Sequence, residues 1–402
     1  MAKKKEKRLL ISESLLESLA KLQEIELEDV EFTMDELEIR LTPGAIVSSA
    51  TGGSTPQAVR DSPLALADTE VEIPSGSYPG SVVEVKLGAT KTEGGSRGYS
   101  ITIGGETAPA FYNFQSRPPH KPVIALDVFD WPKVRLAKAV KMHYREVLDD
   151  PGEWARLCVD RFGAEIINLH LISIDPLNED TSPKEAVKTV SEVLEAVDVP
   201  LCVGGCGDPK KDLAVFKAVA EATEGERILF NSVTLDMDIE ATAKIIDELD
   251  HTVIAFTPMD VNKARELNRK LYDFLPKERI IMDTTTAALG YGIEYAFTVM
   301  ERCRLAALKG DPELNHPISS GTTNAWAARE AWKKMGPEWA PRELRGPIWE
   351  MVTGQMLLLA GVDYFMMMHP AAAKELGETI DNMMRARDVG EAVDWATLRI
   401  GG

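Results

Sequence analysis

The sequence contains few cysteines, no long apolar run and no excess of basic residues. Four cysteines, at positions 158, 202, 206 and 303 of 402 residues, are too scattered for a disulfide framework, so a reducing, cytoplasmic location is expected. No run of about eighteen apolar residues occurs, so we expect no membrane-spanning helix. A formal net charge of −19 argues against binding to nucleic acid, which requires a basic face.

The remaining composition is that of a globular protein, with 44% hydrophobic and 27% charged residues. We predict three parts: an N-terminal helix and linker over residues 1–68, a small β-rich segment over 69–119, and the main domain over 120–402. A helix starting near Ser12 would carry leucines on one face. That face packs either on its own domain or on a partner subunit.

Residues 69–119 show a pattern typical of antiparallel strands. Residues 81–87 and 99–103 alternate between apolar and polar side chains, and TKTEGGSRG between them is suited to a hairpin loop. Prolines at 118, 119 and 122 mark the boundary to the next part. We therefore predict a hairpin ahead of the main domain.

From residue 122 onward, short apolar runs alternate with amphipathic helical segments. Ser182–Pro183 and Asp208–Pro209 are typical helix starts. Eight such units match an α/β fold of the (β/α)8 barrel type. The alternative, a doubly wound sheet, usually has a glycine in its first turn, and DVFDWPK (127–133) has none. The eight runs are 122–128, 165–172, 199–203, 227–230, 252–256, 279–282, 315–319 and 362–368.

The functional site of such a barrel lies at the carboxyl ends of the strands. No predicted strand ends in lysine, which disfavours Schiff-base chemistry, and no pair of glutamates suggests a glycosidase. We expect a polar, mostly neutral mouth that binds a large amide-bearing ligand rather than moving protons. The candidate binding residues are Asp127, Asn168, His170, Gly204, Gly205, Asn231, Ser232, Asp283, Thr284, Thr285, Ser319, Ser320, Gly321, Thr322, Asn324 and His369.

Several of these residues also have a purely structural interpretation. Asp127, Asn231 and Asp283 either face a ligand or cap the following helices. His170 is either a satisfied rim histidine or a functional one, and His369 either binds a ligand or only ends the last strand before Pro370. Loop 319–324 (SSGTTN) suits a phosphate group.

The cysteines and glycines after the third run also have a structural interpretation. Cys202 and Cys206 do not fit zinc or iron–sulfur spacing, so we expect free thiols and no metal site. The nearby glycines 204, 205 and 207 suit either a tight turn or the close approach of a ligand.

Long motifs in the main domain resemble one known family. ALDVFD (125–130), VPLCVGGCGDPKKD (199–212), MDTTTAALGYGIEYAF (282–297), PISSGTTNAWAAREAW (317–332) and GVDYFMMMHP (361–370) are similar to the small subunit of the corrinoid iron–sulfur protein. This family is also called the delta subunit of the acetyl-CoA decarbonylase/synthase complex. The resemblance covers the whole barrel and, more weakly, GGETAPAF (104–111).

The resemblance implies a barrel that pairs with a large subunit carrying the iron–sulfur cluster, so that this chain has no cluster of its own. A cobalamin-type corrinoid would lie between the two subunits. It would receive a methyl group from methyl-tetrahydropterin or methyl-tetrahydrofolate, through a methyltransferase, and deliver it to the acetyl-CoA synthase/CO dehydrogenase. The setting would be the Wood–Ljungdahl pathway of carbon fixation, or acetyl-CoA cleavage in methanogenesis.

On this basis the chain would be a non-catalytic subunit whose barrel mouth contacts the corrinoid or its linking phosphate. The alternative is a stand-alone barrel methyltransferase that binds a methyl-pterin at Asp127, Asn231 and Asp283. An aldolase is disfavoured by the missing lysine.

Overall fold

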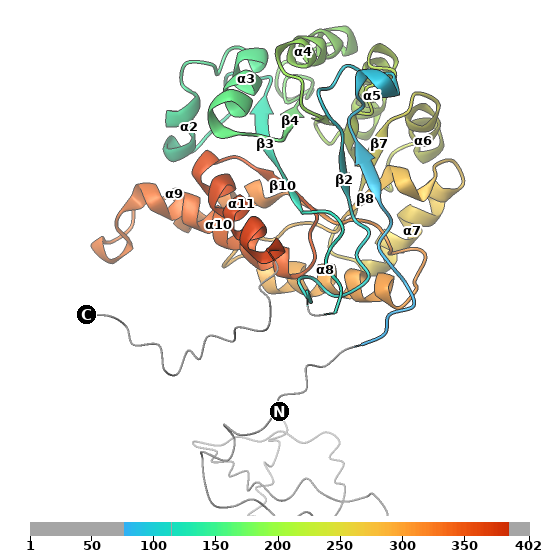
Figure 1. Ribbon diagram of the computed structural model, residues 1–402. Helices are drawn as coiled ribbons and strands as arrows, with labels where there is room; N and C mark the ends of the chain where they lie inside the picture. The colour runs from blue at the N-terminus through green and yellow to red at the C-terminus, as the bar shows by residue number, and fades with distance from the viewer. Residues whose placement is uncertain (1–75, 114, 386–402) are drawn as a thin grey trace, which may run out of the picture. The chain divides into compact units, whose positions relative to one another are not determined.

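The computed structural model describes residues 76–113 and 115–385, which belong to one compact unit, Ile73–Gly402 (Figure 1). The helix and linker predicted for residues 1–68 lie outside the described residues. No helix within the described part of the chain is both long and apolar enough to cross a membrane.

Eight parallel strands form the main sheet, in the order β8-β7-β6-β5-β4-β3-β10-β9. The two edge strands meet through a parallel bridge between Met282 and Ile318, and the Met282 amide donates to the Pro317 carbonyl at 2.8 Å. The sheet is therefore a closed barrel, which confirms the predicted fold and excludes the doubly wound alternative. The strands are β3 (Val123–Phe129), β4 (Ile166–His170), β5 (Leu201–Gly204), β6 (Leu229–Val233), β7 (Thr252–Phe256), β8 (Ile280–Asp283), β9 (Ser319–Ser320) and β10 (Tyr364–Met367).

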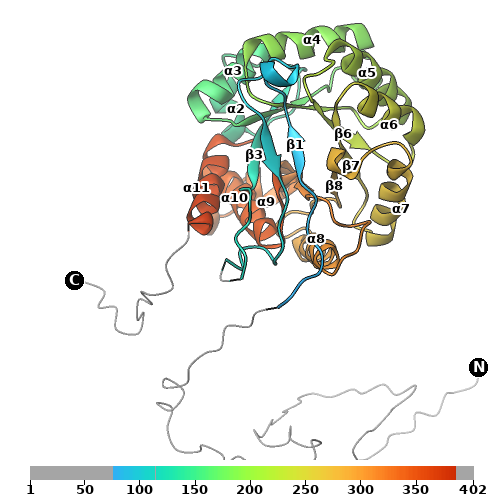
Figure 2. The same ribbon diagram turned by 45° about the vertical axis from the view of Figure 1, so that its right-hand side comes forward.

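Helices alternate with the strands around the barrel (Figure 2). Their starts follow from the sequence: Ser182 and Glu185 form a capping box ahead of α4, and Asp208 accepts from the amides of Lys210 and Lys211 at the start of α5. The helices are α2 (Lys138–Tyr144), α3 (Pro151–Phe162), α4 (Pro183–Ala196), α5 (Pro209–Ala222), α6 (Ile239–Glu248), α7 (Val261–Tyr272), α8 (Ile293–Leu308), α9 (Arg329–Trp332), α10 (Arg342–Leu359) and α11 (Pro370–Met384).

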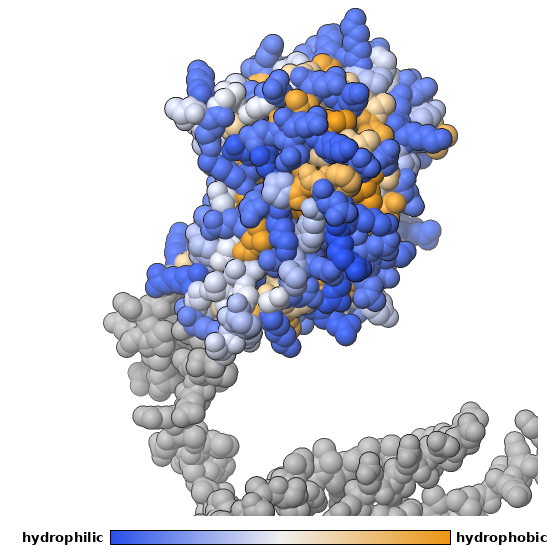
Figure 3. Space-filling model, turned by 90° about the vertical axis from the view of Figure 1, so that its right-hand side faces the viewer, coloured by the Kyte–Doolittle hydropathy of each residue, from blue (hydrophilic) through white to orange (hydrophobic). Residues whose placement is uncertain are grey.

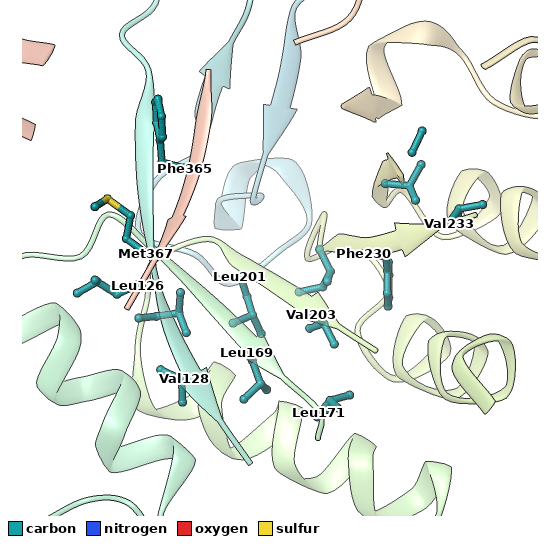
Figure 4. Packing of buried hydrophobic residues seen from close by; sticks show 14 of the residues in the cluster. Leu126, Val128, Leu169, Leu171, Leu201, Val203, Phe230, Val233, Phe365 and Met367 are labelled. Atoms are coloured by element: carbon teal, nitrogen blue, oxygen red, sulfur yellow. The ribbon is translucent and has the colours of Figure 1, made fainter. Parts of the chain in front are cut away.

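The outward faces of the strands form the larger apolar core, where side chains such as Val128, Leu169 and Phe365 pack beneath the helices (Figure 4). Successive side chains of a strand point to opposite faces of the sheet. Every second residue of a strand therefore packs in this outer core, and the residues between them point into the barrel interior. The outer surface seen in Figure 3 is largely hydrophilic, with apolar residues confined to limited areas. The larger core therefore lies between the sheet and its helices, and a smaller one fills the barrel interior.

A hairpin of β1 (Val85–Leu87) and β2 (Ile101–Ile103) precedes the barrel, and its antiparallel pairing confirms the predicted hairpin. The side chains of Leu87 and Ile103 pack in one buried cluster with the first inward residues of the barrel strands, among them Val123 and Ile166. The hairpin thus closes the amino-terminal end of the barrel. The opposite end is left open for a site.

Candidate functional site

A cavity of about 580 Å³ opens at the carboxyl ends of the barrel strands. Its position agrees with the general rule for this fold, and its volume lies in the range of about 300–1,000 Å³ that is usual for small-molecule sites. The residues that line it are Asp127, His170, Gly204, Gly205, Cys206, Gly207, Pro209, Asp212, Asn231, Ser232, Thr234, Met237, Phe256, Asp283, Thr286, Gly321, Thr323, Asn324 and Met366.

One wall of the cavity is a network around Asp127, whose side chain is fully buried on the inner face of β3. One carboxylate oxygen accepts from Asn168 Nδ2 at 2.7 Å and lies 3.1 Å from His170 Nε2. The other accepts from the hydroxyl of Thr323. The His170 ring stacks on Phe129 with centroids 4.8 Å apart. Three separate elements therefore hold this carboxylate and its neighbouring imidazole in place.

The opposite wall carries a second buried carboxylate, that of Asp283 at the end of β8. It accepts from the Thr285 amide at 2.7 Å and from the Ser319 hydroxyl at 3.1 Å. Burial outweighs these two hydrogen bonds and raises the pKa of Asp283 to about 6. The side chain is mostly ionised at neutral pH, and it remains able to take up a proton under mildly acidic conditions.

The loop after β5 forms a third side of the cavity and is fixed by Asp212 from the first turn of α5. The Asp212 carboxylate accepts from the amides of Cys206 and Gly207 at 2.8 and 2.9 Å. A Cβ atom on Gly205 would lie 2.4 Å from that carboxylate, and Gly207 has a φ of +91°. A side chain at 205 would displace the Asp212 carboxylate, and glycine is favoured at 207 by its backbone conformation, as expected for a tight turn.

Helix capping was one of the two roles considered for four of the rim residues. The helices after β3, β6 and β8 are capped by Ala137, Asp238 and Gly292, so the interpretation of Asp127, Asn231 and Asp283 as helix caps is wrong. His369 does cap α11, with its Nδ1 accepting from the Ala371 amide at 3.2 Å.

All four cysteines are free, which includes Cys202 and Cys206, for which free thiols were predicted. Within the described residues, no group of three potential metal-ligating side chains is arranged to hold an ion.

Nine of the sixteen predicted residues line the cavity and seven do not. Asn168 lies beneath Asp127. The hydroxyls of Ser320 and Thr322 bond to each other at 2.8 Å inside the protein, and Thr284 is fully buried. Strand β9 begins four residues later than the predicted run, which places Ser319 under Asp283 rather than at the rim. The seven are Asn168, Thr284, Thr285, Ser319, Ser320, Thr322 and His369.

Other lining residues were missed by the sequence analysis. Met366 lies in a predicted apolar run, and the alternation of β10 turns it inward, where Asn231 Nδ2 approaches its sulfur at 3.3 Å; that alternation was a usable signal. Thr323 stands between two predicted residues in SSGTTN. Asp212 lies on a helix, and nothing local in the sequence connects it to the site. The missed residues are Cys206, Gly207, Pro209, Asp212, Thr234, Met237, Phe256, Thr286, Thr323 and Met366.

The cavity is more acidic than the mostly neutral mouth that we expected. Asp127, Asp212 and Asp283 line it, and no lysine or arginine is among its lining residues. A phosphate group inside this cavity would meet three carboxylates and no cation, which disfavours it. Ligands that donate N–H groups are better suited, because carboxylate and amide oxygens accept hydrogen bonds.

Comparisons with known proteins identify relatives of the whole barrel. A family model described as the CO dehydrogenase/acetyl-CoA synthase delta subunit matches residues 84–375. The acetyl-CoA decarbonylase/synthase complex subunit delta of Archaeoglobus fulgidus is 54% identical over 80% of this chain and 72% of its own length. The subunit of the same name from Methanocaldococcus jannaschii is 44% identical over 91% and 92%.

Solved structures with a similar arrangement are more distant. A dihydropteroate synthase from Vibrio fischeri has a TM-score of 0.46 at 12% identity, covering 75% of this chain and 98% of its own.

Proposed function

The chain belongs to the CO dehydrogenase/acetyl-CoA synthase delta subunit family, and from this premise we propose that it holds a corrinoid together with a larger corrinoid iron–sulfur subunit. The cobalt of the bound corrinoid would carry a methyl group from methyl-tetrahydropterin or methyl-tetrahydrofolate to acetyl-CoA synthase. The chain itself would bind and orient this carrier without catalysing a step.

The observation that carries this proposal is the set of hydrogen-bond acceptors around the open end of the barrel. Asn231 and Asn324 line the cavity beside the carboxylates of Asp127 and Asp283. Asn324 Nδ2 donates to the Thr286 carbonyl at 3.1 Å, and Asn324 Oδ1 accepts no hydrogen bond from the described residues. The amide groups at the edge of a corrinoid donate N–H bonds, so they fit these acceptors. The phosphate that links its nucleotide does not suit this cavity, because the lining carries three carboxylates and no lysine or arginine.

Apolar side chains around the same end support burial by another subunit. Leu177 is 92% exposed in the loop after β4, and Met259 is 40% exposed after β7. Tyr291 and Tyr295 are 51% and 66% exposed near the start of α8. A corrin ring with its side chains is larger than the cavity, so part of its surface requires a partner. Exposed apolar groups next to a polar site are typical of such interfaces.

Corrinoid retention in the heterodimer tests this proposal. The chain is produced together with its larger partner subunit, purified as the pair, and assayed for cobalt per heterodimer. Asn231→Ala and Asn324→Ala are expected to lower the cobalt content, because each removes an acceptor from the cavity. Asn262→Ala, in the first turn of α7 and outside the cavity, is the matched control. Cobalt content that is unchanged in both cavity variants contradicts the proposal.

A second candidate is a barrel methyltransferase that binds a methyl-pterin inside the cavity. The volume of about 580 Å³ suits a ligand of that size. Asp127, Asn231 and Asp283 lie on three different strands around it, and their oxygens suit the N–H groups of a pterin ring. This candidate requires activity from the chain without its partner.

Methyl transfer by the purified chain separates the two candidates. The chain alone is mixed with methyl-tetrahydrofolate and reduced cobalamin, and methylcobalamin is followed by its absorbance. The corrinoid-holding role predicts no rate above that of a heat-denatured sample. A rate that depends on the chain and disappears in Asp283→Asn supports the methyltransferase instead.

A further inference from the structure

One segment of this acidic chain has the opposite charge. Residues 131–145, which include α2, contain five lysines and arginines and no aspartate or glutamate, although the whole chain carries a net charge of −19. The five cations, which are all exposed, are Lys133, Arg135, Lys138, Lys141 and Arg145. Such a local reversal of charge creates a field that attracts acidic partners.

A groove of about 230 Å³ is lined by residues of α2, of the segment around α9 and of the start of α10. Its apolar lining includes Met142 and Trp332, which are 55% and 43% exposed. Lys138, Arg145 and Arg342 are the cations that line it, and Glu343 is its single acidic residue. The groove therefore combines apolar side chains with a cationic border.

Most of this charge is not neutralised within the chain. Lys133 pairs with Glu179 at 3.0 Å. For Lys138 and Arg145, the described residues supply no ion pair, although most exposed cations on α4, α6 and α7 have acidic partners one turn away or nearby. Arg342 is held by a hydrogen bond from its Nε to the Trp332 carbonyl at 2.6 Å. These cations are thus available to a partner.

The groove is also connected to the cavity at the barrel mouth. The short 3-10 helix η4 (Thr322–Ala327) carries Thr323 and Asn324 into the cavity and Trp326 into the groove. Trp326 in turn stacks on His369 with centroids 6.0 Å apart. A molecule bound in the groove would therefore contact η4, the same segment that forms one wall of the cavity.

We propose that this groove, between α2 and α9, docks an acidic segment of another subunit of the acetyl-CoA decarbonylase/synthase complex. An apolar side chain of that segment packs against Met142 and Trp332, and its carboxylates meet Lys138 and Arg145. The proposal rests on family membership and charge complementarity, and it does not depend on where the corrinoid binds.

Charge reversal tests the docking surface in the assembled complex. Tagged full-length chain carrying Lys138→Glu and Arg145→Glu is produced in cells that make the whole complex, and the co-purified subunits are quantified. Reversing two border charges is expected to reduce one partner subunit roughly tenfold and to weaken the salt dependence of its retention. Lys184→Glu with Lys217→Glu, on the exposed faces of α4 and α5, changes the charge equally and is expected to retain every subunit.

A cross-link identifies the occupant without changing any charge. A photoreactive phenylalanine derivative replaces Met142, the intact complex is irradiated, and cross-linked peptides are sequenced by mass spectrometry. The expected product joins the photoreactive residue at position 142 to a peptide rich in aspartate and glutamate from a different subunit. The proposal is overturned by cross-links only within this chain or to a second copy of it, and equally by wild-type subunit amounts in the Lys138/Arg145 variant.

Discussion

The two ends of the barrel are built from the same strands and differ in almost every property. At the amino-terminal end the inward side chains are apolar, the hairpin of β1 and β2 covers them, and buried charges are paired. At the carboxyl end the inward side chains are polar, a cavity remains open, and three carboxylates face it without a cation among the lining residues. One end therefore contributes stability and the other contributes binding capacity.

The ion pairs show this division most directly. Arg304 on α8 is buried and contacts Glu106 at 2.6 Å and Asp363 at 2.5 Å. Asp283, at the carboxyl end of β8, has two hydrogen bonds and no cation among its partners. A buried carboxylate without a cation is a cost to folding, and such costs are typical of sites that bind or react. Substitutions at the two ends of the barrel test this difference.

Replacing Arg304 with methionine is expected to have the largest effect. It leaves Glu106 and Asp363 buried without their cation, which typically costs about 3–5 kcal/mol of unfolding free energy. Urea unfolding followed by circular dichroism measures it. Arg302→Met, on the exposed face of the same helix, is the control and is expected to change the unfolding free energy by less than about 0.5 kcal/mol. Equal losses of unfolding free energy in the two variants would show that the buried ion pairs of Arg304 do not add to stability.

Shortening one buried side chain of the hairpin is expected to lower the unfolding free energy by slightly less. Leu87 is 1% exposed within the cluster that closes the barrel, so Leu87→Ala leaves a cavity and should lower the unfolding free energy by about 2–5 kcal/mol. Cobalt retention by the folded heterodimer should not change, because the hairpin lies at the opposite end. Lost cobalt with a normal fold would mean that the two ends are coupled.

At the carboxyl end, the unpaired carboxylate of Asp283 should make the unfolding free energy depend on pH. Burial raises the pKa of Asp283 to about 6 from an ordinary value of 3.8, a difference of about 3 kcal/mol. The protonated form is favoured in the folded state. Its contribution to stability is therefore complete below about pH 4 and is lost as the pH rises through about 6.

Unfolding free energies of the wild type and Asp283→Asn between pH 4 and pH 8 measure this loss. As the pH rises, the unfolding free energy of the variant is expected to increase relative to that of the wild type. Asp247→Asn, exposed on α6, should show no such trend. A difference that is constant over the whole range would contradict the raised pKa.

The smallest expected effect is chemical labelling of one thiol. Cys158, Cys202 and Cys303 are buried, whereas Cys206 lines the cavity and is partly exposed. Burial nevertheless raises the pKa of Cys206 to about 11, so iodoacetamide should modify one thiol slowly at pH 8 and faster as the pH increases. Mass spectrometry of Cys206→Ala should show no label. Modification of a second cysteine in the native protein would contradict the burial of the other three.

Much of the fold was predictable because it depends on local patterns. The apolar runs matched the strands within a few residues, since strands buried on both faces are continuously apolar. Ser182 and Asp208 placed two helix starts, because capping uses only neighbouring residues. Strand β9 was predicted less well: only Ser319 and Ser320 pair with β10, and that pairing depends on neighbours far away in the sequence.

The site was predictable only as a region. Asp127, Asn231 and Asp283 could be assigned to the strand ends, but their alternative role as helix caps could be dismissed only from the structure. Thr284 and Thr322 are threonines next to lining residues, yet both are fully buried and neither lines the cavity. Which way a rim side chain points depends on where its strand ends and what packs behind it.

The barrel, its strand count, the end that carries the site and the family follow from the chain alone, because periodicity and long motifs are properties of the sequence. The structure added that the hairpin packs into the amino-terminal end of the barrel. Asp212 reaches the loop after β5 from a helix, and Trp326 brings the α2 groove next to the cavity wall. Such contacts join residues that no local pattern relates, since they exist only once the strands have closed into a ring.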